Sequence, residues 1–461
     1  MKQLPYDIVY FLGIGGIGMS ALARYFHSQG VHVLGYDRTS TALTTELQLE
    51  GIAVHFDDST LEIPQLVRHA DKSKVLVVYT PAIPGDSYEL NWFIENGYHM
   101  QKRSQVLGLI TESSDTIAVA GTHGKTTTSS MVAHILQYSG MGCNAFLGGI
   151  ATNYNSNLLI NPDARWTVVE ADEFDRSFLT LSPWLSIITS MDADHLDIYG
   201  THSYMLESFN LFAQKIRNGG RIVYKSGLPL EREKLDYAGG ISTYCLNDSS
   251  DYRAKDIRVE DGSYKFTFQS PDLKIENLTL GLAGRHNIEN ATAACAVALM
   301  AGVSPDVIPG ALASFKGVKR RFEYVVKTEK LVIIDDYAHH PEELKACINS
   351  ARELYPDKKI TGVFQPHLFS RTRDFADEFA RSLELLDQVI LLPIYPAREK
   401  PMEGIHSQML LDKIFGITKS LVEKSELLAE LRRSEHEVVI MLGAGDIDAM
   451  VSTVAYGLTN E

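Results

Sequence analysis

The feature that most constrains the fold is a succession of short apolar segments, each followed by a glycine-rich or acidic loop and then by a helical pattern. "DIVYFLG", "DTIAVAG" and "LVIIDD" are three of these segments. Continuous apolar segments of this kind are typical of strands buried on both faces, and their alternation with helices is typical of parallel sheets. The sequence therefore predicts an α/β protein.

The strand candidates fall into three groups, which predicts three domains because a chain of 461 residues is too long for one hydrophobic core. We place the domains at residues 1–110, 111–316 and 317–461. Within the second, residues 221–280 become polar and alternating, which favours an antiparallel insertion or a sheet edge. The strand candidates are "YDIVYFLGIG", "HVLGYD" and "KVLVVYTPAIP", then "DTIAVAG", "WTVVEADE" and "WLSIITSMDADH", and finally "LVIIDDYAHHP", "KITGVFQPH", "QVILLPIYP" and "EVVIMLGAGD".

Composition and charge exclude several classes of function. The formal net charge of -15 argues against nucleic acid or an anionic membrane as the main partner, because either would require clustered Lys and Arg. No apolar run approaches the ~18 residues that crossing a bilayer requires. The first residues read as a strand rather than a signal peptide, and the four cysteines form no C-x-x-C pair. We expect a cytoplasmic protein without nucleic-acid partner or membrane insertion.

A first glycine motif follows the first strand candidate. Gly13, Gly15 and Gly18 match G-x-G-x-x-G, and Asp37 follows 19 residues after Gly18 at the end of the next strand candidate. Such glycines let a pyrophosphate approach the backbone N–H groups at the start of a helix, and the acid is placed to meet a ribose hydroxyl. Taken alone, the motif fits a dinucleotide such as NAD, and it fits a plain strand-to-helix turn equally well.

A second glycine loop, "GTHGKTTT" at residues 121–128, also follows an apolar strand and opens a helix. The usual phosphate-loop pattern requires a glycine at position 119, where this chain has Val119. The shorter loop still supplies backbone N–H groups for a phosphate, with Lys125 to neutralise β and γ oxygens and the Thr126 hydroxyl to bind Mg²⁺. The alternative interpretation is a glycine turn with a solvated lysine.

Acidic residues follow two further strand candidates. Mg²⁺ requires hard oxygen ligands near Thr126, and Glu170 stands directly at the end of "WTVVE". The other acids of that segment, Asp172, Glu173 and Asp175, also fit a solvated acidic loop. The next strand candidate ends in a second cluster, which comprises Asp192, Asp194, His195 and Asp197. A histidine among acidic residues beyond a strand end is a candidate metal ligand.

Motifs along nearly the whole chain resemble those of the Mur ligase family, the ATP-dependent synthetases of peptidoglycan precursors. They are, in order, "GTHGKTTT", "EADE", "DADHLDIYG", "GRHNIENATAA", "KRRFE", "DDYAHHP" and "FQPHLFSRTRD". The missing glycine at position 119 is normal for the phosphate loop of this family. The resemblance is strongest to those members that add L-alanine to UDP-N-acetylmuramate, whose first motif also reads G-x-G-G-x-G-M-S.

The resemblance implies a fold and an activity. The fold would comprise a Rossmann-like N-terminal domain that holds a UDP-sugar, a central P-loop ATPase-like domain that binds ATP, and a Rossmann-like C-terminal domain that brings the amino acid. The activity would be an ATP-dependent ligation in which the lactyl carboxylate of UDP-N-acetylmuramate becomes an acyl phosphate and L-alanine attacks it, with Mg²⁺ as cofactor. We expect a monomer or a weak homodimer.

The resemblance also assigns roles to individual residues. Catalytic roles fall to Lys125, Arg321 and His339, and metal binding to Thr126, Glu170 and His195. ATP binding falls to Gly121, Thr122, His123, Gly124, Lys125, Thr126, Thr127, His286, Asn287 and Arg321. Binding of the UDP-sugar falls to Gly13, Gly15, Gly16, Gly18, Ser20 and Asp37, and binding of the alanine carboxylate falls to Arg371.

Several of these residues have simpler interpretations. Asn287 also fits a residue near a helix cap. Arg321 also fits a solvated basic surface, and Arg371 also fits a surface ion pair with Asp374 or Asp377.

Three rival functions compete with the ligation of L-alanine. They are a sister ligase that adds another amino acid or a peptide to the same sugar, an NAD-dependent dehydrogenase, and a nucleotide-binding regulator without chemistry.

The chain departs from the family pattern at two positions. Several sister ligases carry a carbamylated lysine about fifteen residues after the metal histidine, where this chain has Asn210, so we predict no such modification. Some alanine ligases read H-R-x-[ST]-R where this chain has Leu368 as the second residue, which leaves Arg371 alone to bind the substrate.

Overall fold

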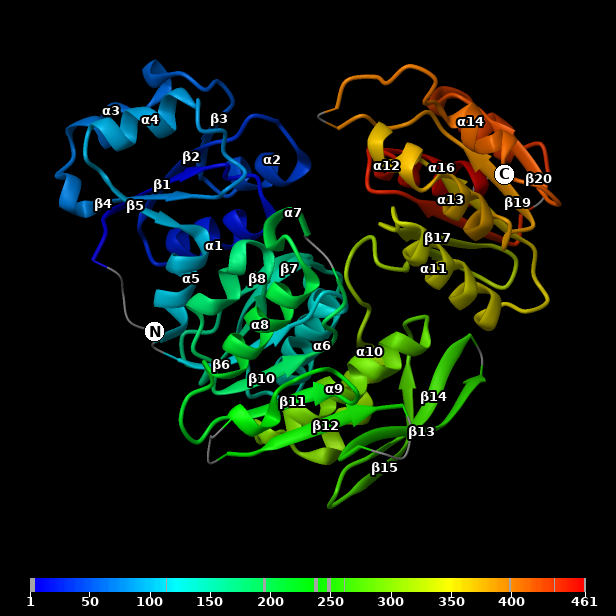
Figure 1. Cartoon of the computed structure of the whole chain (residues 1–461), viewed down its shortest axis with the longest axis horizontal. Coiled ribbons are helices and arrows are strands. Elements are labelled where there is room, and N and C mark those ends of the chain that lie inside the picture. The colour runs from blue at the N-terminus through cyan, green and yellow to red at the C-terminus, as the bar shows by residue number, and fades with distance from the viewer. Residues whose placement is uncertain are drawn as a thin grey trace. The chain divides into compact units, whose positions relative to one another are not determined.

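The structure is a computed structural model that describes residues 5–112, 114–193, 196–235, 239–246, 250–260, 262–397, 399–434 and 436–459. The chain forms two compact units. The first comprises residues 1–255, 267–276 and 289–312, and the second comprises residues 256–266, 277–288 and 313–461. Each unit is described by itself (Figure 1).

The N-terminal part of the first unit is a five-stranded parallel sheet in the order β3-β2-β1-β4-β5. The strands β1, β2 and β4 were predicted, whereas the short edge strands β3 and β5 were not. The strands are Ile8–Leu12 (β1), His32–Tyr36 (β2), Ala53–His55 (β3), Val75–Tyr79 (β4) and His99–Lys102 (β5). The helices are Ile17–Ser28 (α1), Ala42–Leu49 (α2), Gln65–His69 (α3), Tyr88–Glu95 (α4) and Arg103–Glu112 (α5), with 3₁₀ turns at Thr60–Glu62 (η1) and Lys72–Lys74 (η2).

This sheet is apolar on both faces because both are covered. Along β1, Val9 and Phe11 belong to one buried cluster while Ile8, Tyr10 and Leu12 belong to another. In Figure 1, α3 and α4 lie on one face of the sheet and α1 and α5 on the other. Both faces of β1 are thus buried, as its continuous apolar sequence predicted.

The central sheet has ten strands in the order β15-β14-β13-β12-β11-β10-β6-β9-β7-β8. The strands are Asp115–Ala120 (β6), Asn144–Ala151 (β7), Ser156–Leu159 (β8), Trp166–Ala171 (β9), Leu185–Ile188 (β10), Arg221–Lys225 (β11), Ile241–Cys245 (β12), Tyr252–Glu260 (β13), Ser263–Gln269 (β14) and Lys274–Leu280 (β15). The helical elements are Lys125–Tyr138 (α6), Phe174–Thr180 (η3), Leu196–Tyr199 (α7), His202–Ala213 (α8), Arg232–Lys234 (η4), Arg285–Met300 (α9), Pro305–Val307 (η5) and Ile308–Ser314 (α10).

The prediction for residues 221–280 needs a correction. The strands β11 and β12 continue the parallel sheet from β10, and β12 pairs parallel with β13. The middle of β11 is buried, so its apolar residues belong to the sheet core although polar residues flank them. The edge that the sequence predicted is formed by β13, β14 and β15. At the opposite edge, β7 and β8 pair antiparallel and were not predicted.

The C-terminal sheet, in the second unit, has six strands in the order β16-β17-β21-β18-β19-β20, of which β16 pairs antiparallel and the others parallel. The four predicted strands are confirmed as Val332–Asp336 (β17), Ile360–Phe364 (β18), Gln388–Leu391 (β19) and Val438–Leu442 (β21), and the edges are Glu323–Lys327 (β16) and Thr418–Leu421 (β20). The helices are Pro341–Leu354 (α11), Phe369–Asp374 (α12), Ala376–Leu383 (α13), Ser407–Asp412 (α14), Leu427–Leu431 (α15) and Asp448–Thr459 (α16), with a 3₁₀ turn at Lys424–Glu426 (η6).

The four cysteines and the helix lengths complete the description of the fold. Cys143, Cys245, Cys295 and Cys347 are buried free thiols. Among the described residues, every helix is too short or too polar to cross a membrane.

Candidate active site

The first glycine loop joins β1 to α1 and is shaped by its own glycines. Gly13 has a φ of +84°, which favours glycine. The Gly15 N–H donates to Oδ2 of Asp37 at 2.8 Å, and a Cβ on Gly15 would lie 2.8 Å from the same oxygen. Gly16 is the N-cap of α1. Asp37 thus holds the loop, and its contact with a ribose stays a prediction.

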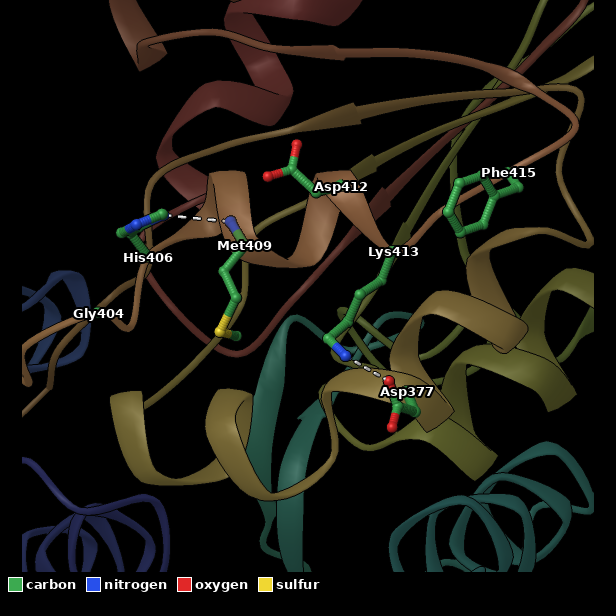
Figure 2. Close-up of a pocket in the computed structure, with 7 residues that line it drawn as sticks. All are labelled: Asp377, Gly404, His406, Met409, Asp412, Lys413 and Phe415. Atoms are coloured by element: carbon green, nitrogen blue, oxygen red, sulfur yellow. Dashed lines mark hydrogen bonds and ion pairs between the residues drawn. The ribbon is translucent and has the colours of Figure 1, made fainter.

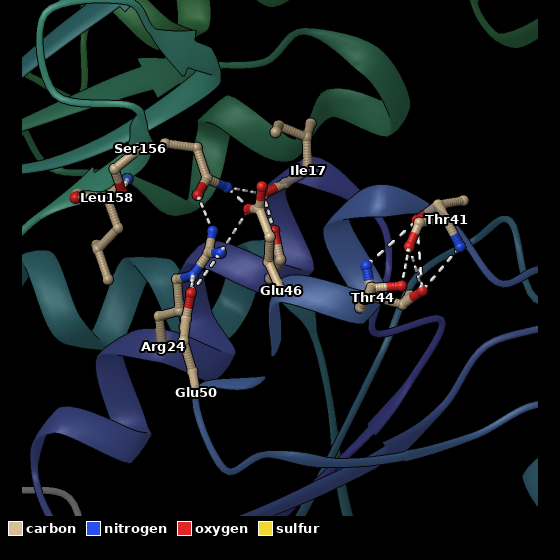
Figure 3. A network of polar contacts seen from close by, with 11 residues as sticks. Ile17, Arg24, Thr41, Thr44, Glu46, Glu50, Ser156 and Leu158 are labelled. Atoms are coloured by element: carbon tan, nitrogen blue, oxygen red, sulfur yellow. Dashed lines mark hydrogen bonds and ion pairs between the residues drawn. The ribbon is translucent and has the colours of Figure 1, made fainter. Parts of the chain in front are cut away.

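A polar network fixes the start of α1 against the central sheet (Figure 3). Nη1 of Arg24 donates to Oδ1 of the fully buried Asn157 at 2.8 Å, and Nδ2 of Asn157 donates to the Ile17 carbonyl at 2.6 Å and to the Ser20 hydroxyl at 3.0 Å. Glu50 accepts from Nε of Arg24 at 2.8 Å. The buried Ser20 hydroxyl therefore has structural partners, and its predicted role in substrate binding stays a prediction.

The phosphate loop joins β6 to α6, as predicted, and its glycines are required by close contacts. Gly121 and Gly124 have φ values of +135° and +81°. A Cβ on Gly121 would lie 2.1 Å from Oγ1 of Thr189, and a Cβ on Gly124 would lie 2.8 Å from Oδ1 of Asn290. Because φ is positive and the neighbouring atoms are close, only glycine fits at these two positions.

The end of the neighbouring strand β10 anchors the loop. The hydroxyls of Thr122 and Ser190 are 2.9 Å apart, and the His123 N–H donates to the Ser190 hydroxyl at 2.8 Å. Thr126 and Thr127, at the start of α6, are buried. Ser190 was not among the predicted residues, because a serine after a strand carries no signal of its own.

Lys125 forms a buried ion pair with Glu173, which rules out the interpretation as a solvated lysine. Its Nζ lies 2.9 and 2.7 Å from the two carboxylate oxygens of Glu173 and donates to the Gly121 carbonyl at 2.7 Å. The side chain of Glu173 is fully buried and that of Lys125 is 13% exposed. Burial raises the pKa of Glu173, and the Lys125 ammonium opposes that rise.

The interpretation as a solvated acidic loop is therefore wrong for Glu173, and Asp172 and Asp175 are only partly exposed. Asp172 pairs with Arg103 at 3.3 Å and Asp175 with Lys102 at 2.7 Å, in addition to the buried pair of Glu173. Sequence reasoning missed the two bases, which stand at the junction of α5 with β5, an edge strand that was not predicted.

Glu170, at the end of β9, presents an unsatisfied oxygen. Its Oε2 is buried without a hydrogen-bond partner, and a Cβ on Gly148 would lie 2.2 Å from that atom. An orphaned carboxylate oxygen beside the phosphate loop fits the hard-oxygen ligand that Mg²⁺ requires. Asp194 and His195 lie outside the described residues, and so does the side chain of Asp197. Asp192 is exposed, 3.9 Å from Nε2 of His123.

A cavity of about 300 Å³ connects the first glycine loop with Glu170. Its lining comes from the N-terminal and central sheets and includes Gly16, Gly18, Thr80, Lys102, Arg103, Phe146, Glu170 and Phe174. A Cβ on Gly18 would lie 2.7 Å from Nη1 of Arg103, so the guanidinium lies against the loop. Bases, glycine backbone and the candidate metal ligand thus line one cavity.

In the second unit, His339 and Arg371 lie in one cluster of side chains around His367. Nη1 of Arg371 is 3.4 Å from Nδ1 of His367, and the rings of His339 and His367 are 6.0 Å apart. The proposed surface pair of Arg371 is ruled out, because Asp374 pairs with Arg373 at 2.7 Å. Asp377 pairs with Lys413 at 2.7 Å.

The surroundings of His339 define its protonation. Nδ1 is 2.9 Å from the Tyr337 carbonyl, which can only accept, so Nδ1 carries the hydrogen and Nε2 has a lone pair. Burial lowers the pKa of His339, Glu343 raises it and Arg371 lowers it further. Oδ1 of Asp336 accepts from the Ala338 N–H at 2.8 Å and thereby holds the turn. His339 is therefore a neutral base at pH 7.

The remaining predicted residues also belong to the second unit. Nδ2 of Asn287 donates to the Ala283 carbonyl at 2.6 Å at the start of α9, which agrees with the alternative role near a cap. A Cβ on Gly284 would lie 2.3 Å from the ring of His286. Arg321 is exposed, whereas its neighbour Arg320 contacts Asp335 at 3.5 Å. Their roles toward ATP stay predictions.

Another hollow in the second unit contains two polar contacts between residues that line it (Figure 2). Lys413 pairs with Asp377 at 2.7 Å, and the Met409 N–H donates to Nδ1 of His406 at 3.1 Å, where His406 caps α14. Phe415 on its rim is 71% exposed. None of the predicted site residues lines it, so we assign it no part in the chemistry.

Three protein-family models match the chain. The Mur ligase family catalytic domain covers residues 8–114, the Mur ligase middle domain covers residues 119–298, and the Mur ligase glutamate ligase domain covers residues 320–445. The chain belongs to the Mur ligase family. This finding excludes the NAD-dependent dehydrogenase and the regulator without chemistry, and it confirms the three-domain α/β fold that the sequence predicted.

Individual Mur ligases resemble this one along its whole length. The UDP-N-acetylmuramate–L-alanine ligase of Cytophaga hutchinsonii is 51% identical, covering 97% of this chain and 96% of the relative. The enzyme of that name from Porphyromonas gingivalis is 52% identical over 97% and 98%. The crystal structure of UDP-N-acetylmuramate-alanine ligase MurC from Thermotoga maritima matches with a TM-score of 0.82 at 28% identity, covering 97% of both chains.

Proposed function

We propose that this Mur ligase joins L-alanine to the lactyl carboxylate of UDP-N-acetylmuramate at the expense of ATP. The observation that carries this proposal is the identity of 51–52%, over 97% of the chain, to ligases named for that reaction. The two anion-binding loops and the cavity between the first loop and Glu170 fit a UDP-sugar and a nucleotide held side by side. The family is ATP-dependent, and the reaction belongs in the cytoplasm.

The chemistry proceeds in two displacements. A lactyl carboxylate oxygen attacks the γ-phosphorus of ATP and ADP leaves, which gives an acyl phosphate. The amine of L-alanine then attacks the acyl carbon, the amide forms and inorganic phosphate leaves. Activation is required because a carboxylate resists nucleophiles, and phosphorylation both removes its charge and supplies a leaving group.

The residues of the first unit bind and neutralise the phosphates. Backbone N–H groups of residues 121–126 surround the ATP phosphates, and Lys125 donates to them once Glu173 has released it. Thr126, Glu170 and His195 would hold Mg²⁺, which when bound offsets charge on the transferring phosphoryl group. Gly13, Gly15, Gly16 and Gly18 hold the diphosphate of the UDP-sugar at the start of α1.

The residues of the second unit handle the amino acid. The Arg371 fork suits the alanine carboxylate, and the lone pair on Nε2 of His339 suits the ammonium proton. Arg321 would add positive charge at the γ-phosphate, and His286 and Asn287 would contact adenine. We place the domain boundaries near residues 110 and 316, since the three sheets lie within residues 8–102, 115–280 and 323–442.

The proposal is tested by phosphate release. The chain should release phosphate from ATP in the presence of UDP-N-acetylmuramate and L-alanine together, and far less when either is left out. Replacing L-alanine by other amino acids or by a peptide separates this function from that of a sister ligase. Full activity with a peptide and none with L-alanine would overturn the assignment.

Glu170→Ala should raise the Mg²⁺ concentration that half-maximal activity requires, on the order of tenfold or more, because it removes an unsatisfied oxygen beside the phosphate loop. The measurement is a Mg²⁺ titration of phosphate release at saturating substrates. Asp115→Asn serves as the matched control, since Asp115 pairs with Arg165 at 2.6 Å away from the loops. An Mg²⁺ titration of Glu170→Ala that coincides with that of the parent would place the metal elsewhere, with Asp192 as the next candidate.

Arg371→Ala should weaken the use of L-alanine by about ten- to a hundredfold, the effect of losing a charge-assisted contact of roughly 1.5 to 3 kcal/mol. Steady-state kinetics should show the change in the KM for L-alanine, with ATP and UDP-sugar hardly affected. The control is Arg373→Ala on the same helix, whose exposed guanidinium pairs with Asp374. An unaltered KM for L-alanine in Arg371→Ala would remove the assignment.

Asn210, at the position of the modified lysine in sister ligases, has structural contacts. Its side chain is buried, its Nδ2 donates to the Leu206 carbonyl at 3.0 Å and its Oδ1 accepts from the Glu231 N–H at 2.9 Å. The amide cannot be carbamylated as a lysine can, so the absence of this modification stays our prediction. A monomer or weak homodimer is likewise our expectation.

A further inference from the structure

The segment that follows β9 carries three acids whose partners belong to both anion-binding sites. The pairs are Asp172 with Arg103 at 3.3 Å, Glu173 with Lys125 at 2.7 Å and Asp175 with Lys102 at 2.7 Å. Only two residues lie between the first acid and the last. One short segment therefore contacts bases at two places in the fold, the junction of β5 with α5 and the start of α6.

The three bases occupy positions where substrate phosphates are expected. Lys125 belongs to the phosphate loop, and its ammonium already makes contacts of 2.7 to 2.9 Å to Glu173 and to the Gly121 carbonyl. Lys102 and Arg103 line the cavity beside the first glycine loop, and the guanidinium of Arg103 lies against Gly18. The carboxylates thus stand in for anions at both sites.

The backbone of the segment has an unfavourable conformation that the surrounding contacts hold in place. Asp175 and Arg176 have φ values of +52° and +55°, a left-handed conformation that costs free energy in residues other than glycine. The Glu173 carbonyl is fixed by the Tyr199 hydroxyl at 2.5 Å and the Arg176 N–H at 2.9 Å. Since the acids share this short backbone, release of one pair changes the geometry of the others.

We propose that residues 172–175 act as an internal anion that couples the two substrate sites. Their carboxylates pair with Lys102, Arg103 and Lys125, and the diphosphate of the UDP-sugar and the phosphates of ATP compete with them for these bases. Lys102 and Arg103 then receive the diphosphate. This inference rests on the proposed function, because it takes both ligands from that function.

The coupling has a definite sign. Displacement of the segment by one ligand removes the competitor of the other, so each ligand should tighten the binding of the second by the same factor. The factor should be about fivefold or more, within the usual range for coupled sites. Substitutions that weaken the three ion pairs should raise the affinity for each ligand when it binds alone. They should also bring the coupling factor between the two ligands toward one.

The test is calorimetric titration of a non-hydrolysable ATP analogue with and without saturating UDP. In the parent chain, UDP should lower the Kd of the analogue at least about fivefold. In the double variant Asp172→Asn/Asp175→Asn, the analogue alone should bind several-fold more tightly than to the parent, and UDP should change its Kd less than twofold. Asp115→Asn, which loses an ion pair elsewhere in the same unit, should behave like the parent.

Two results would overturn the inference. One is a double variant with the coupling factor of the parent, and the other is a double variant that binds UDP more weakly, which would mean that the acids support the site. Thermal unfolding of each variant shows that it is folded. Failure here is distinct from failure of the proposed function, since a parent chain that ligates L-alanine without any coupling would contradict the inference alone.

Discussion

Lys125→Ala should lower the kcat of ligation by about 10²- to 10³-fold, while the Kd for UDP-N-acetylmuramate changes little. The lysine is the charged donor of the phosphate loop, and the loss of one preorganised donor to a developing negative charge in a dry site costs about 10² to 10³ in rate. The proposed site of the UDP-sugar is the other glycine loop, between β1 and α1. The measurements are single-turnover phosphate release and calorimetry with the UDP-sugar.

This variant also leaves the fully buried Glu173 without its partner. Removing one member of a buried ion pair costs about 3 kcal/mol of stability or more, so a folding defect would confuse the result. The double variant Lys125→Ala/Glu173→Gln removes the charge as well and should regain most of the lost thermal stability. Ligation near the parent rate by either variant would end the assignment of the phosphate loop.

The fold was largely predictable from the chain because buried parallel strands have a distinct pattern. The segments that became β1, β6 and β17 each contain a continuous apolar run, and the structure buries these runs inside a sheet. Most of the missed strands lie at or beside sheet edges, whereas β11 and β12 lie inside the central sheet and are flanked by polar residues. Strand β20, with the sequence "TKSL", is mostly exposed and has no apolar face to reveal it.

The candidate site was predictable only where function requires a particular backbone. Gly121 and Gly124 have conformations and neighbours that exclude a side chain, so their pattern is visible in the sequence. Glu173 could not be distinguished from its acidic neighbours, because its importance comes from burial beside Lys125. Such burial depends on contact between two segments that are far apart in the sequence, and no local sequence pattern reveals it.

The same limit applies to Lys102 and Arg103. In the sequence they are two ordinary bases at a strand-to-helix junction, and only the tertiary structure brings them to Asp172, Asp175 and the first glycine loop. Pairings between residues about seventy positions apart set the partners of both bases. Long-range pairing was therefore the information that the sequence lacked.

His339→Gln should lower turnover on the order of 10²-fold near neutral pH, with the loss shrinking as the pH rises. The glutamine keeps a donor toward the Tyr337 carbonyl but has no lone pair basic enough to take the ammonium proton. Because burial lowers the pKa of His339 below its usual value, the parent remains a neutral base throughout the neutral range and loses this function only in more acidic solution. At high pH, L-alanine loses its proton to solvent and the variant approaches the parent.

The pH–rate profile distinguishes this role from a structural one. His436→Gln is the matched control, because His436 is also partly buried with a lowered pKa but contacts Thr361 and the Leu431 carbonyl instead of the alanine site. That variant should follow the shape of the parent profile even if its stability falls. A purely structural role for His339 would scale the rate equally at every pH, so a variant profile parallel to that of the parent would contradict proton transfer to Nε2.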